Sequence, residues 1–255
     1  MRRPTSLLLA IASTLSLFLL APHRQAQAKD CPSNAVPVGP ICVDKYEASL
    51  WETTDQQVIK KIRDNTVTLA DLRTAGARQR GISGNDYGPG CLPTGKGCVN
   101  LYAVSIPGVR PSAFMTWFQA LAAARNSGKR LLTNAEWQAA ALGTPDGAPC
   151  VVTGPSSQPT GTAGCVSDAG AFDMVGNVWE FTADWVPLSQ GDCPGWGEFS
   201  KAQMCLAGTD PDGGGPGVLI RGGSIGYGDA SSVFAVRGDW TPSRGRLPVG
   251  FRAAH

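Results

Sequence analysis

Eight cysteines are the residues of this sequence that could do chemistry most directly, either as metal-binding thiolates or as disulfides. Thiolate zinc sites place two cysteines close together as Cys-x-x-Cys, or add histidines. The sequence has no Cys-x-x-Cys pair, and its two histidines are His23 and His255. An even number of cysteines without these patterns favours disulfides over zinc. The eight are Cys31, Cys42, Cys91, Cys98, Cys150, Cys165, Cys193 and Cys205.

The order of the cysteines suggests their partners, although eight cysteines allow many pairings and the sequence alone proves none of them. They form four neighbouring pairs, and each pair flanks a stretch rich in Gly, Pro or Ser. Disulfides persist in oxidising compartments outside the cytoplasm. We predict that each disulfide closes one such loop, with the pairs Cys31–Cys42, Cys91–Cys98, Cys150–Cys165 and Cys193–Cys205.

Histidine and carboxylate chemistry have less support in this sequence. Two histidines are too few to hold an iron ion. His23 lies in the first 28 residues, which are expected to be removed as a signal peptide, so a Ser–His triad could use only His255. Several carboxylates could act as general acids or bases, but nothing in the sequence pairs two of them across a cleft. They are Asp168, Asp173, Glu180, Asp184, Asp229 and Asp239.

The first 28 residues have the order of a secretory signal peptide. Met1-Arg2-Arg3 is positive, residues 6–21 carry no charge, and Ala26-Gln27-Ala28 is a small-x-small cleavage site. The alternative, a membrane anchor, needs about 20 apolar residues, and this run is shorter. We expect a secreted or periplasmic mature chain, residues 29–255, with no membrane span after cleavage.

The mature chain is long enough to form one domain with a buried core, and we expect residues 29–255 to form a single domain. The leader holds three arginines and no acidic residue, which leaves 19 basic and 20 acidic residues. Because no basic run remains, nucleic acid is not an expected partner. A protein, a peptide or a small ligand stays open as the partner.

Two helices and several short strands are expected to hold these residues in place. Residues 116–127 have helical spacing, and Thr133 with Glu136 forms a capping box at the start of a second helix over residues 134–142. Strands are expected over residues 41–51, 178–185, 218–221, 232–237 and 249–253. The pattern predicts an α+β, loop-rich fold with two central helices and small antiparallel sheets.

The large and charged side chains near these elements are expected to be structural. Four tryptophans offer large apolar rings to a domain with little regular structure, so we expect them in the core. Lys129 and Arg130 are expected to pair with a buried carboxylate or with loop carbonyls. The tryptophans are Trp117, Trp137, Trp179 and Trp185.

Four regions together resemble the sulfatase-modifying factor family, whose best-known member is the formylglycine-generating enzyme. The resemblance spans residues 38–254 and implies an irregular fold related to C-type lectins. The regions are Asp44-Lys45-Tyr46-Glu47-Ala48-Ser49, Gly128-Lys129-Arg130-Leu131-Leu132-Thr133-Asn134-Ala135-Glu136-Trp137, Asp173-Met174-Val175-Gly176-Asn177-Val178-Trp179-Glu180-Phe181-Thr182-Ala183-Asp184-Trp185, and Arg221-Gly222-Gly223-Ser224 with Gly250-Phe251-Arg252.

The resemblance implies a structural calcium site in residues 173–180. Asp173 and Glu180 would supply side-chain oxygens, and Gly176 and Val178 would supply backbone carbonyls. Calcium binds six to eight oxygens, which a turn between two carboxylates can provide. The alternative is that Asp173 caps a turn and Glu180 pairs with an arginine.

The family's oxidase uses two cysteines after the Arg-Gly-Gly-Ser-like segment, which hold copper(I). In this sequence Tyr227 and Ser232 stand at those places on an ungapped count, and no cysteine follows Cys205. Copper(I) prefers soft thiolates, so copper chemistry is not expected, and iron is not expected because histidines are lacking.

The resemblance therefore suggests a pseudoenzyme that keeps the fold. Its groove, which accepts an extended peptide in the family, would bind a ligand or partner protein through Ser224, Tyr227, Asp229 and Arg237. One alternative is an oxidoreductase of altered chemistry, with a metal held by carboxylates and Tyr227. Another is a purely structural module of an exported assembly.

Overall fold

The computed structural model describes residues 30–255 except 85, 188–190, 199, 206–215 and 246–247. The expected signal peptide lies outside the described residues. The described chain has four α-helices and two 3-10 helices: α1 (Gln56–Arg63), α2 (Leu69–Thr74), α3 (Trp117–Asn126), α4 (Asn134–Ala141), η1 (Pro194–Glu198) and η2 (Gly228–Ala230). None of the helices in this part is long and apolar enough to cross a membrane.

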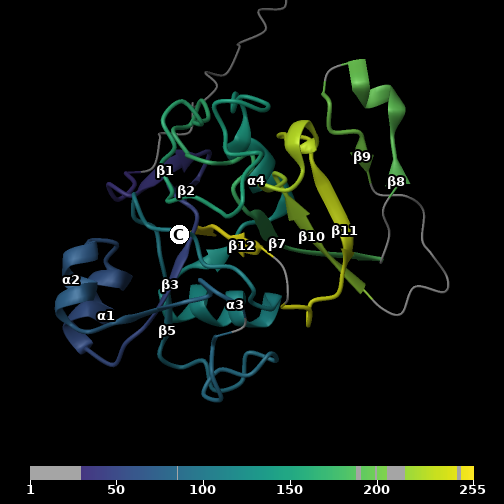
Figure 1. The fold of residues 1–255 in the computed structure, drawn as a ribbon. Helices are drawn as coiled ribbons and strands as arrows, with labels where there is room; N and C mark the ends of the chain where they lie inside the picture. Colours follow the sequence, from purple (N-terminus) through teal and green to yellow (C-terminus); the bar gives the residue numbers. More distant parts are fainter. Residues whose placement is uncertain (1–29, 85, 188–190, 199, 206–215, 246–247) are drawn as a thin grey trace, which may run out of the picture.

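The strands are short and form small sheets (Figure 1). The first half of the described chain contains β1 (Ala35–Val38), β2 (Ile41–Asp44), β3 (Ser49–Glu52), β4 (Arg78–Arg80) and β5 (Leu101–Val104). The second half contains β6 (Arg130–Leu131), β7 (Trp179–Pro187), β8 (Gly191–Asp192), β9 (Met204–Cys205), β10 (Pro216–Arg221), β11 (Val236–Trp240), β12 (Val249–Phe251) and β13 (Ala253–Ala254).

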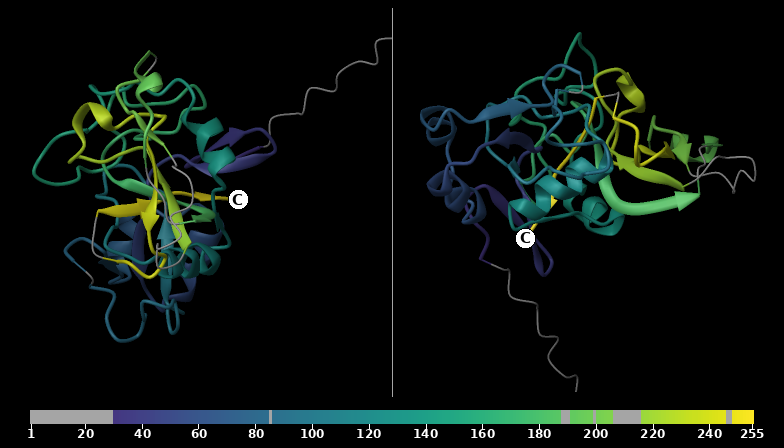
Figure 2. Two further views of the ribbon diagram at one scale, coloured as in Figure 1. Left: turned by 90° about the vertical axis from the view of Figure 1, so that its right-hand side faces the viewer. Right: turned by 90° about the horizontal axis from the view of Figure 1, so that it is seen from below.

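Strands that are distant in the sequence pair in the two larger sheets. One has the order β1-β2-β13-β6, so the last strand pairs with one of the first, and Figure 2 shows this end of the chain beside the β1–β2 hairpin. The other has the order β11-β10-β7-β12, in which β12 runs parallel to β7. Strands β7 and β11 of this second sheet carry Glu180 of the expected metal segment and Arg237 of the expected groove.

The two central helices were predicted correctly. Helix α3 begins at a capping box formed by Thr116 and Gln119, and α4 begins at the one formed by Thr133 and Glu136. Two further helices that were not predicted from the sequence, α1 and α2, also form. Helix α1 buries Val58, Ile59 and Ile62 on one face, a short amphipathic pattern within a polar region.

The expected strands form with shifted bounds. The strand expected over residues 41–51 is two strands, β2 and β3, and the last of the intervening residues, Ala48, donates its backbone N–H to the carbonyl of Phe251. Strand β11 begins at Val236, later than expected. These breaks depend on partners from distant parts of the chain, which local patterns do not reveal.

The core confirms most of the expected tryptophan anchors. Trp137 is fully buried and Trp179 is 3% exposed. Trp117 is partly buried and packs against the main core cluster. Trp185 was expected in the core, but 43% of its surface is exposed. It lies at the outer part of β7, where its ring packs edge-on against Trp117 at 5.0 Å.

All four disulfides have the predicted pairing: Cys31–Cys42, Cys91–Cys98, Cys150–Cys165 and Cys193–Cys205. None of the eight cysteines is free. The four bridges indicate a protein of an oxidising, extracytoplasmic compartment. They also remove every thiol of the sequence from metal binding.

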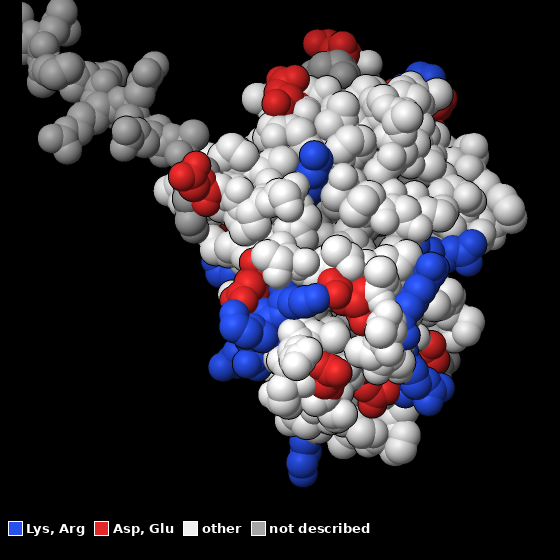
Figure 3. Space-filling model, turned by 90° about the vertical axis from the view of Figure 1, so that its left-hand side faces the viewer, with Lys and Arg blue, Asp and Glu red and all other residues white. Residues whose placement is uncertain are grey.

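The charged residues are unevenly distributed on the face that carries α1 and α2. Figure 3 shows Lys, Arg, Asp and Glu intermixed on the lower half of this face, while most of its upper half is uncharged. Some of these charges form ion pairs between or within the two helices, such as Lys61–Asp71 at 2.5 Å. This face therefore offers no large patch of a single charge sign.

Candidate functional site

The segment expected to bind calcium ends at a buried ion pair. Arg252 donates from Nε to both carboxylate oxygens of Glu180 at 2.9 Å, and from Nη2 to Oε1 at 2.7 Å. The Trp137 indole N–H donates to Oε2 of Glu180 at 2.6 Å. The side chains of Arg252 and Glu180 are 0% and 1% exposed. Both oxygens of Glu180 are therefore already occupied by donors.

Asp173 anchors the loop that the Cys150–Cys165 disulfide closes. Its backbone has φ of 57°, and its Oδ2 accepts the backbone N–H of Gly161 at 2.6 Å. The backbone N–H of Thr162 is 3.3 Å from Oδ1 of the same carboxylate. Asp173 is 1% exposed, and these loop amides are hydrogen-bond donors to its buried carboxylate.

The residues between the two carboxylates pack closely on neighbouring backbone. The N–H of Gly176 donates to the carbonyl of Gly222 at 3.0 Å. A Cβ at Gly176 would lie 2.4 Å from the carbonyl oxygen of Val151, and φ is +79°, so only glycine suits this position. The N–H of Val178 donates to Oε1 of Glu47 at 3.2 Å.

Glu47 brings a third acidic side chain into the same buried region. Its Oε2 accepts from Nδ2 of Asn177 at 2.5 Å. Burial raises the pKa of Glu47 well above its ordinary range, and the charges of Asp173 and Glu180 raise it further. Arg252 acts in the opposite direction and thus offsets part of the negative charge of this region.

These contacts do not fit a calcium ion held jointly by Asp173 and Glu180. A calcium site needs free oxygens that converge on one point, whereas Arg252 and Trp137 already occupy Glu180. No group of three or more acidic, Cys or His residues in the described chain is arranged to hold a metal. The contacts match the alternative in which Asp173 caps a turn and Glu180 pairs with an arginine.

Thermal unfolding can test directly whether residues 173–180 bind calcium. We expect the midpoint of thermal unfolding to be the same with millimolar calcium and with an excess of chelator, because the buried arginine supplies the positive charge. The mature chain with intact disulfides should be used, and magnesium serves as the control for ionic strength. A rise in the unfolding midpoint with calcium but not with magnesium would support calcium binding by residues 173–180.

The Arg221-Gly222-Gly223-Ser224 segment is structural in its contacts. The Arg221 guanidinium lies 5.0 Å from the centre of the Trp137 ring and donates to three backbone carbonyls of residues 233–235. Burial lowers the pKa of Arg221 to about 10. A Cβ at Gly223 would lie 2.3 Å from Oγ of Ser231. The two glycines therefore permit a close backbone approach.

The structure separates the four residues predicted to line a groove. Ser224 is 1% exposed, so it does not line an open surface. Asp229 is exposed and pairs with Lys201 at 2.7 Å. Tyr227 and Arg237 lie together, because Nη1 of Arg237 donates to the Tyr227 hydroxyl. Only Tyr227 and Arg237 thus share one surface.

Aromatic and charged residues that the sequence analysis did not include complete this surface. Arg237 forms a two-point ion pair with Asp239, with its closest contact at 2.5 Å. The guanidinium carbons of Arg237 and Arg244 lie 5.7 Å and 4.2 Å from the centre of the Trp240 ring. Trp179 packs edge-on against Tyr227 at 5.1 Å. We call these six residues the Tyr227 surface: Trp179, Tyr227, Arg237, Asp239, Trp240 and Arg244.

Two buried indoles of the Tyr227 surface have unpaired donors. The N–H groups of Trp179 and Trp240 have no hydrogen-bond partner among the described residues, although the two side chains are only 3% and 4% exposed. An unpaired buried donor costs about 1–3 kcal/mol. Arg237 and Asp239 alternate with the buried Val236, Gly238 and Trp240 along β11, a signal that was available in the sequence but required this strand to be placed correctly.

The Lys129 prediction is confirmed, since Lys129 reaches the buried carboxylate of Asp44 at 2.7 Å. Arg130 instead lies on the surface, where its side chain is 45% exposed and pairs with Glu136 at 2.7 Å. Burial opposes ionisation of Asp44, but the charge of Lys129 and a hydrogen bond with His255 outweigh burial, so its pKa is lowered. His255 Nε2 lies 3.0 Å from Oδ1 of Asp44. This histidine therefore has a structural partner.

The second sheet and its turns belong to the part of the chain that matches a known family. Residues 152–255 match the family described as "Sulfatase-modifying factor enzyme 1-like domain". This region is therefore similar to sulfatase-modifying factor domains. It contains the Asp173 turn, the Arg221 segment and Arg252, all of which carried the resemblance in the sequence.

Comparison with solved structures supports the fold. The Major Tropism Determinant M1 variant is 18% identical, with a TM-score of 0.50 over 90% of this chain and 53% of that chain. The P3c variant is also 18% identical, with a TM-score of 0.50 over 88% of this chain and 52% of that chain. The chain thus spans about half the length of these proteins, which are C-type-lectin-like. At this identity the likeness shows the fold alone.

A further structure, PvdO from Pseudomonas aeruginosa, is 18% identical, with a TM-score of 0.41 over 86% of this chain and 82% of that chain. The curated proteins include no match to the sequence. The α+β, loop-rich fold related to C-type lectins rests on the likeness to the Major Tropism Determinant variants.

Proposed function

We propose that this sulfatase-modifying-factor-like domain is an exported binding domain without catalytic activity, which binds a ligand, a peptide or a partner protein at the Tyr227 surface. The observation that carries the proposal is a cluster of guanidinium and aromatic groups: Arg237 lies near the rings of Tyr227 and Trp240, and the exposed Arg244 stacks on Trp240. An acceptor group on an incoming chain can pair with such guanidinium groups.

The arrangement of charges supports binding of an acceptor group. Arg244 is exposed and stacks on the ring of Trp240, while the side chain of Arg237 is 16% exposed and held by Asp239. Guanidinium groups on aromatic faces are common anchors of protein and peptide interfaces. The surface therefore suits carbonyl or carboxylate oxygens of an incoming chain.

Thiolate chemistry has no residue to use at this surface. All eight cysteines form disulfides, and the sequence has none after Cys205. The Tyr227 hydroxyl, which the alternative hypothesis assigns to a metal, receives a hydrogen bond from Arg237. The positive charge of the Arg237 guanidinium repels a metal cation placed at the Tyr227 hydroxyl oxygen. A metal-dependent oxidoreductase is thus the less supported hypothesis.

Replacing Arg237 with glutamine tests the proposal. We expect capture of partners from extracytoplasmic extracts by the immobilised mature chain to fall at least about tenfold, because the stacked and paired guanidinium is lost. Arg80 is a matched control, since its side chain is 17% exposed and pairs with Glu52 in the same way, in another sheet. The Arg80→Gln variant should capture partners like the parent chain.

Two results would contradict the proposal. Equal capture by the Arg237→Gln variant and the parent would remove the Tyr227 surface from binding. Stoichiometric iron or copper in the purified parent chain would favour the oxidoreductase. Thermal unfolding of both variants should be measured first, so that a loss of capture is compared between chains of equal stability.

A further inference from the structure

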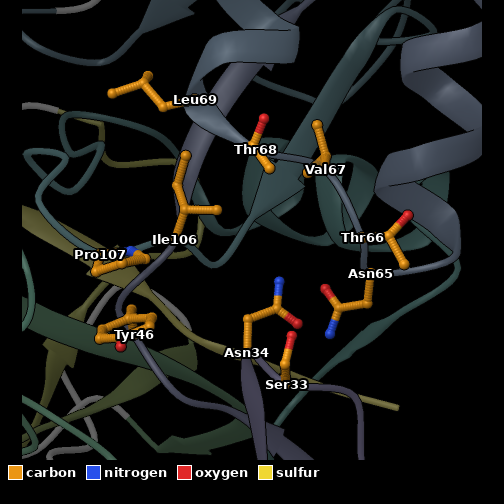
Figure 4. A pocket seen from close by; sticks show the side chains of 10 residues that line it. All are labelled: Ser33, Asn34, Tyr46, Asn65, Thr66, Val67, Thr68, Leu69, Ile106 and Pro107. Carbon is orange, nitrogen blue, oxygen red and sulfur yellow. The ribbon is translucent and has the colours of Figure 1, made fainter.

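A separate pocket lies between the β1–β2 hairpin and the connection from α1 to α2. Its volume is about 420 Å³, within the size range of small-molecule sites. It shares no residue with the Tyr227 surface. Figure 4 shows side chains from several elements around it, among them Asn34, Tyr46, Asn65, Thr66, Ile106 and Pro107.

The pocket has no charged residue in its lining, which consists of Ser, Thr, Asn, Tyr and apolar side chains. This is unusual beside α1 and α2, whose outer surface carries many charges of both signs (Figure 3). A phosphate, a carboxylate or a cation would lose its hydration there without gaining a charged partner. The lining therefore suits a neutral ligand.

Polar and apolar groups occupy different parts of the pocket. Figure 4 shows Tyr46, Ile106 and Pro107 gathered on one side, and the amide groups of Asn34 and Asn65 directed toward each other on another. Adjacent apolar and amide walls fit a ligand that has both C–H faces and several hydroxyl groups. A pyranose ring has this combination.

Hydrogen bonds hold the polar wall in place without a ligand. Asn34 Nδ2 donates to the carbonyl of Ser105 at 2.9 Å, and Oγ of Ser105 donates to the carbonyl of Asn34 at 3.0 Å. The backbone N–H of Tyr46 donates to the same Ser105 hydroxyl at 3.1 Å. The Tyr46 ring stacks on Phe172, with centroids 5.4 Å apart. Preorganised groups bind at lower entropic cost.

One buried acceptor of this wall, Oδ1 of Asn34, has no hydrogen-bond donor among the described residues. Asn34 itself is 8% exposed. Asn65, on the opposite wall, is 3% exposed and has φ of 56°; its Nδ2 lies 3.3 Å from Nε2 of His255, which leaves its Oδ1 and a second amide hydrogen for a ligand. A ligand hydroxyl can donate to an amide oxygen and accept from an amide N–H at once. Such a group would satisfy Asn34 with a small adjustment of the pocket.

We propose that this pocket binds a neutral carbohydrate, with a sugar ring against Tyr46 and Ile106 and its hydroxyl groups between Asn34 and Asn65. This site is independent of the Tyr227 surface, so either proposal can fail without the other. It requires no metal, because the binding groups are amides, hydroxyls and an aromatic ring.

The experiment uses the mature chain with intact disulfides and titrates it with glucose and N-acetylglucosamine, followed by NMR. Their charged counterparts, glucuronic acid and glucosamine, are measured in parallel. We expect saturable binding of at least one neutral sugar with a dissociation constant below about 10 mM, and at least about tenfold weaker binding of its charged counterpart. Absence of saturation by both neutral sugars, or equal binding of charged and neutral forms, would overturn the proposal.

Two variants and one control place the sugar in the pocket. Asn65→Gly keeps a residue that tolerates positive φ but removes the amide, and should weaken binding about tenfold. Thr66→Trp puts a large ring on an exposed lining residue and should abolish binding. Thr54→Trp introduces the same ring at an exposed residue outside this pocket and should not change binding. Binding by Thr66→Trp equal to that by Thr54→Trp would overturn the assignment.

Discussion

Replacing Arg252 with methionine is expected to lower the free energy of unfolding by about 3–5 kcal/mol, the usual cost of removing one member of a buried ion pair. The guanidinium is fully buried, contacts both oxygens of Glu180, and also donates to the carbonyls of Asp44 and Phe172. Without it, Glu180 keeps a buried negative charge near Glu47 and Asp173. Urea unfolding of the mature chain measures the loss.

Removing both charges of this pair should be less harmful than removing one. The double variant Arg252→Met/Glu180→Gln leaves no unpaired carboxylate, so it should regain part of the stability lost by Arg252→Met. Lys201→Met is the exposed control, since Lys201 and Asp229 are 73% and 68% exposed and such pairs contribute little. A loss by Arg252→Met no larger than by Lys201→Met would contradict the role given to Arg252.

The deficit of the Arg252→Met variant should also depend on pH. The pKa of Glu47 is higher in the folded chain than in the unfolded chain. The contribution of Glu47 to stability is therefore fully present at pH values below its pKa in the unfolded chain, and it is lost as pH rises through its pKa in the folded chain. Arg252 limits this rise in pKa, because its charge favours ionised Glu47. The variant should therefore lose more stability at pH 8 than at pH 5. The same deficit at both values would count against this coupling.

Removing the Cys150–Cys165 disulfide should have the second large effect. The bridge spans 15 residues, and a loop of this size contributes about 3 kcal/mol through the entropy of the unfolded chain. The closed loop also holds the Asp173 turn, since Val151 accepts from the N–H of Asn177 at 2.7 Å and Gly161 donates to Asp173. The variant Cys150→Ala/Cys165→Ala should unfold at clearly lower urea concentration.

The Cys193–Cys205 disulfide is the matched control. It spans 12 residues, so loop entropy alone predicts a nearly equal loss. The bridge joins the β8–β9 hairpin, which lies at the periphery of the molecule in Figure 1. We expect a smaller loss for Cys193→Ala/Cys205→Ala. If the two double variants lose equal stability, contacts of the 150–165 loop with the Asp173 turn contribute nothing beyond entropy.

The sequence by itself determined the features that depend on local chemistry. Neighbouring cysteines predicted all four disulfides, because each closes one short loop. The capping box of Thr133 and Glu136 predicted the start of α4, because its hydrogen bonds span only three residues. The ordered family segments predicted the C-type-lectin-related fold. Helix α1 was missed because its apolar stripe has only three buried residues.

Only the tertiary structure decided what the candidate site residues contact. Glu180 is 72 residues from its partner Arg252, and Glu47 is 130 residues from Asn177, so no local spacing reveals that these charges meet. The same holds for the predicted groove, which the fold divides by burying Ser224, turning Asp229 toward Lys201 and pairing Tyr227 with Arg237. Burial and charge compensation arise from packing between distant segments, which residue type and order do not specify.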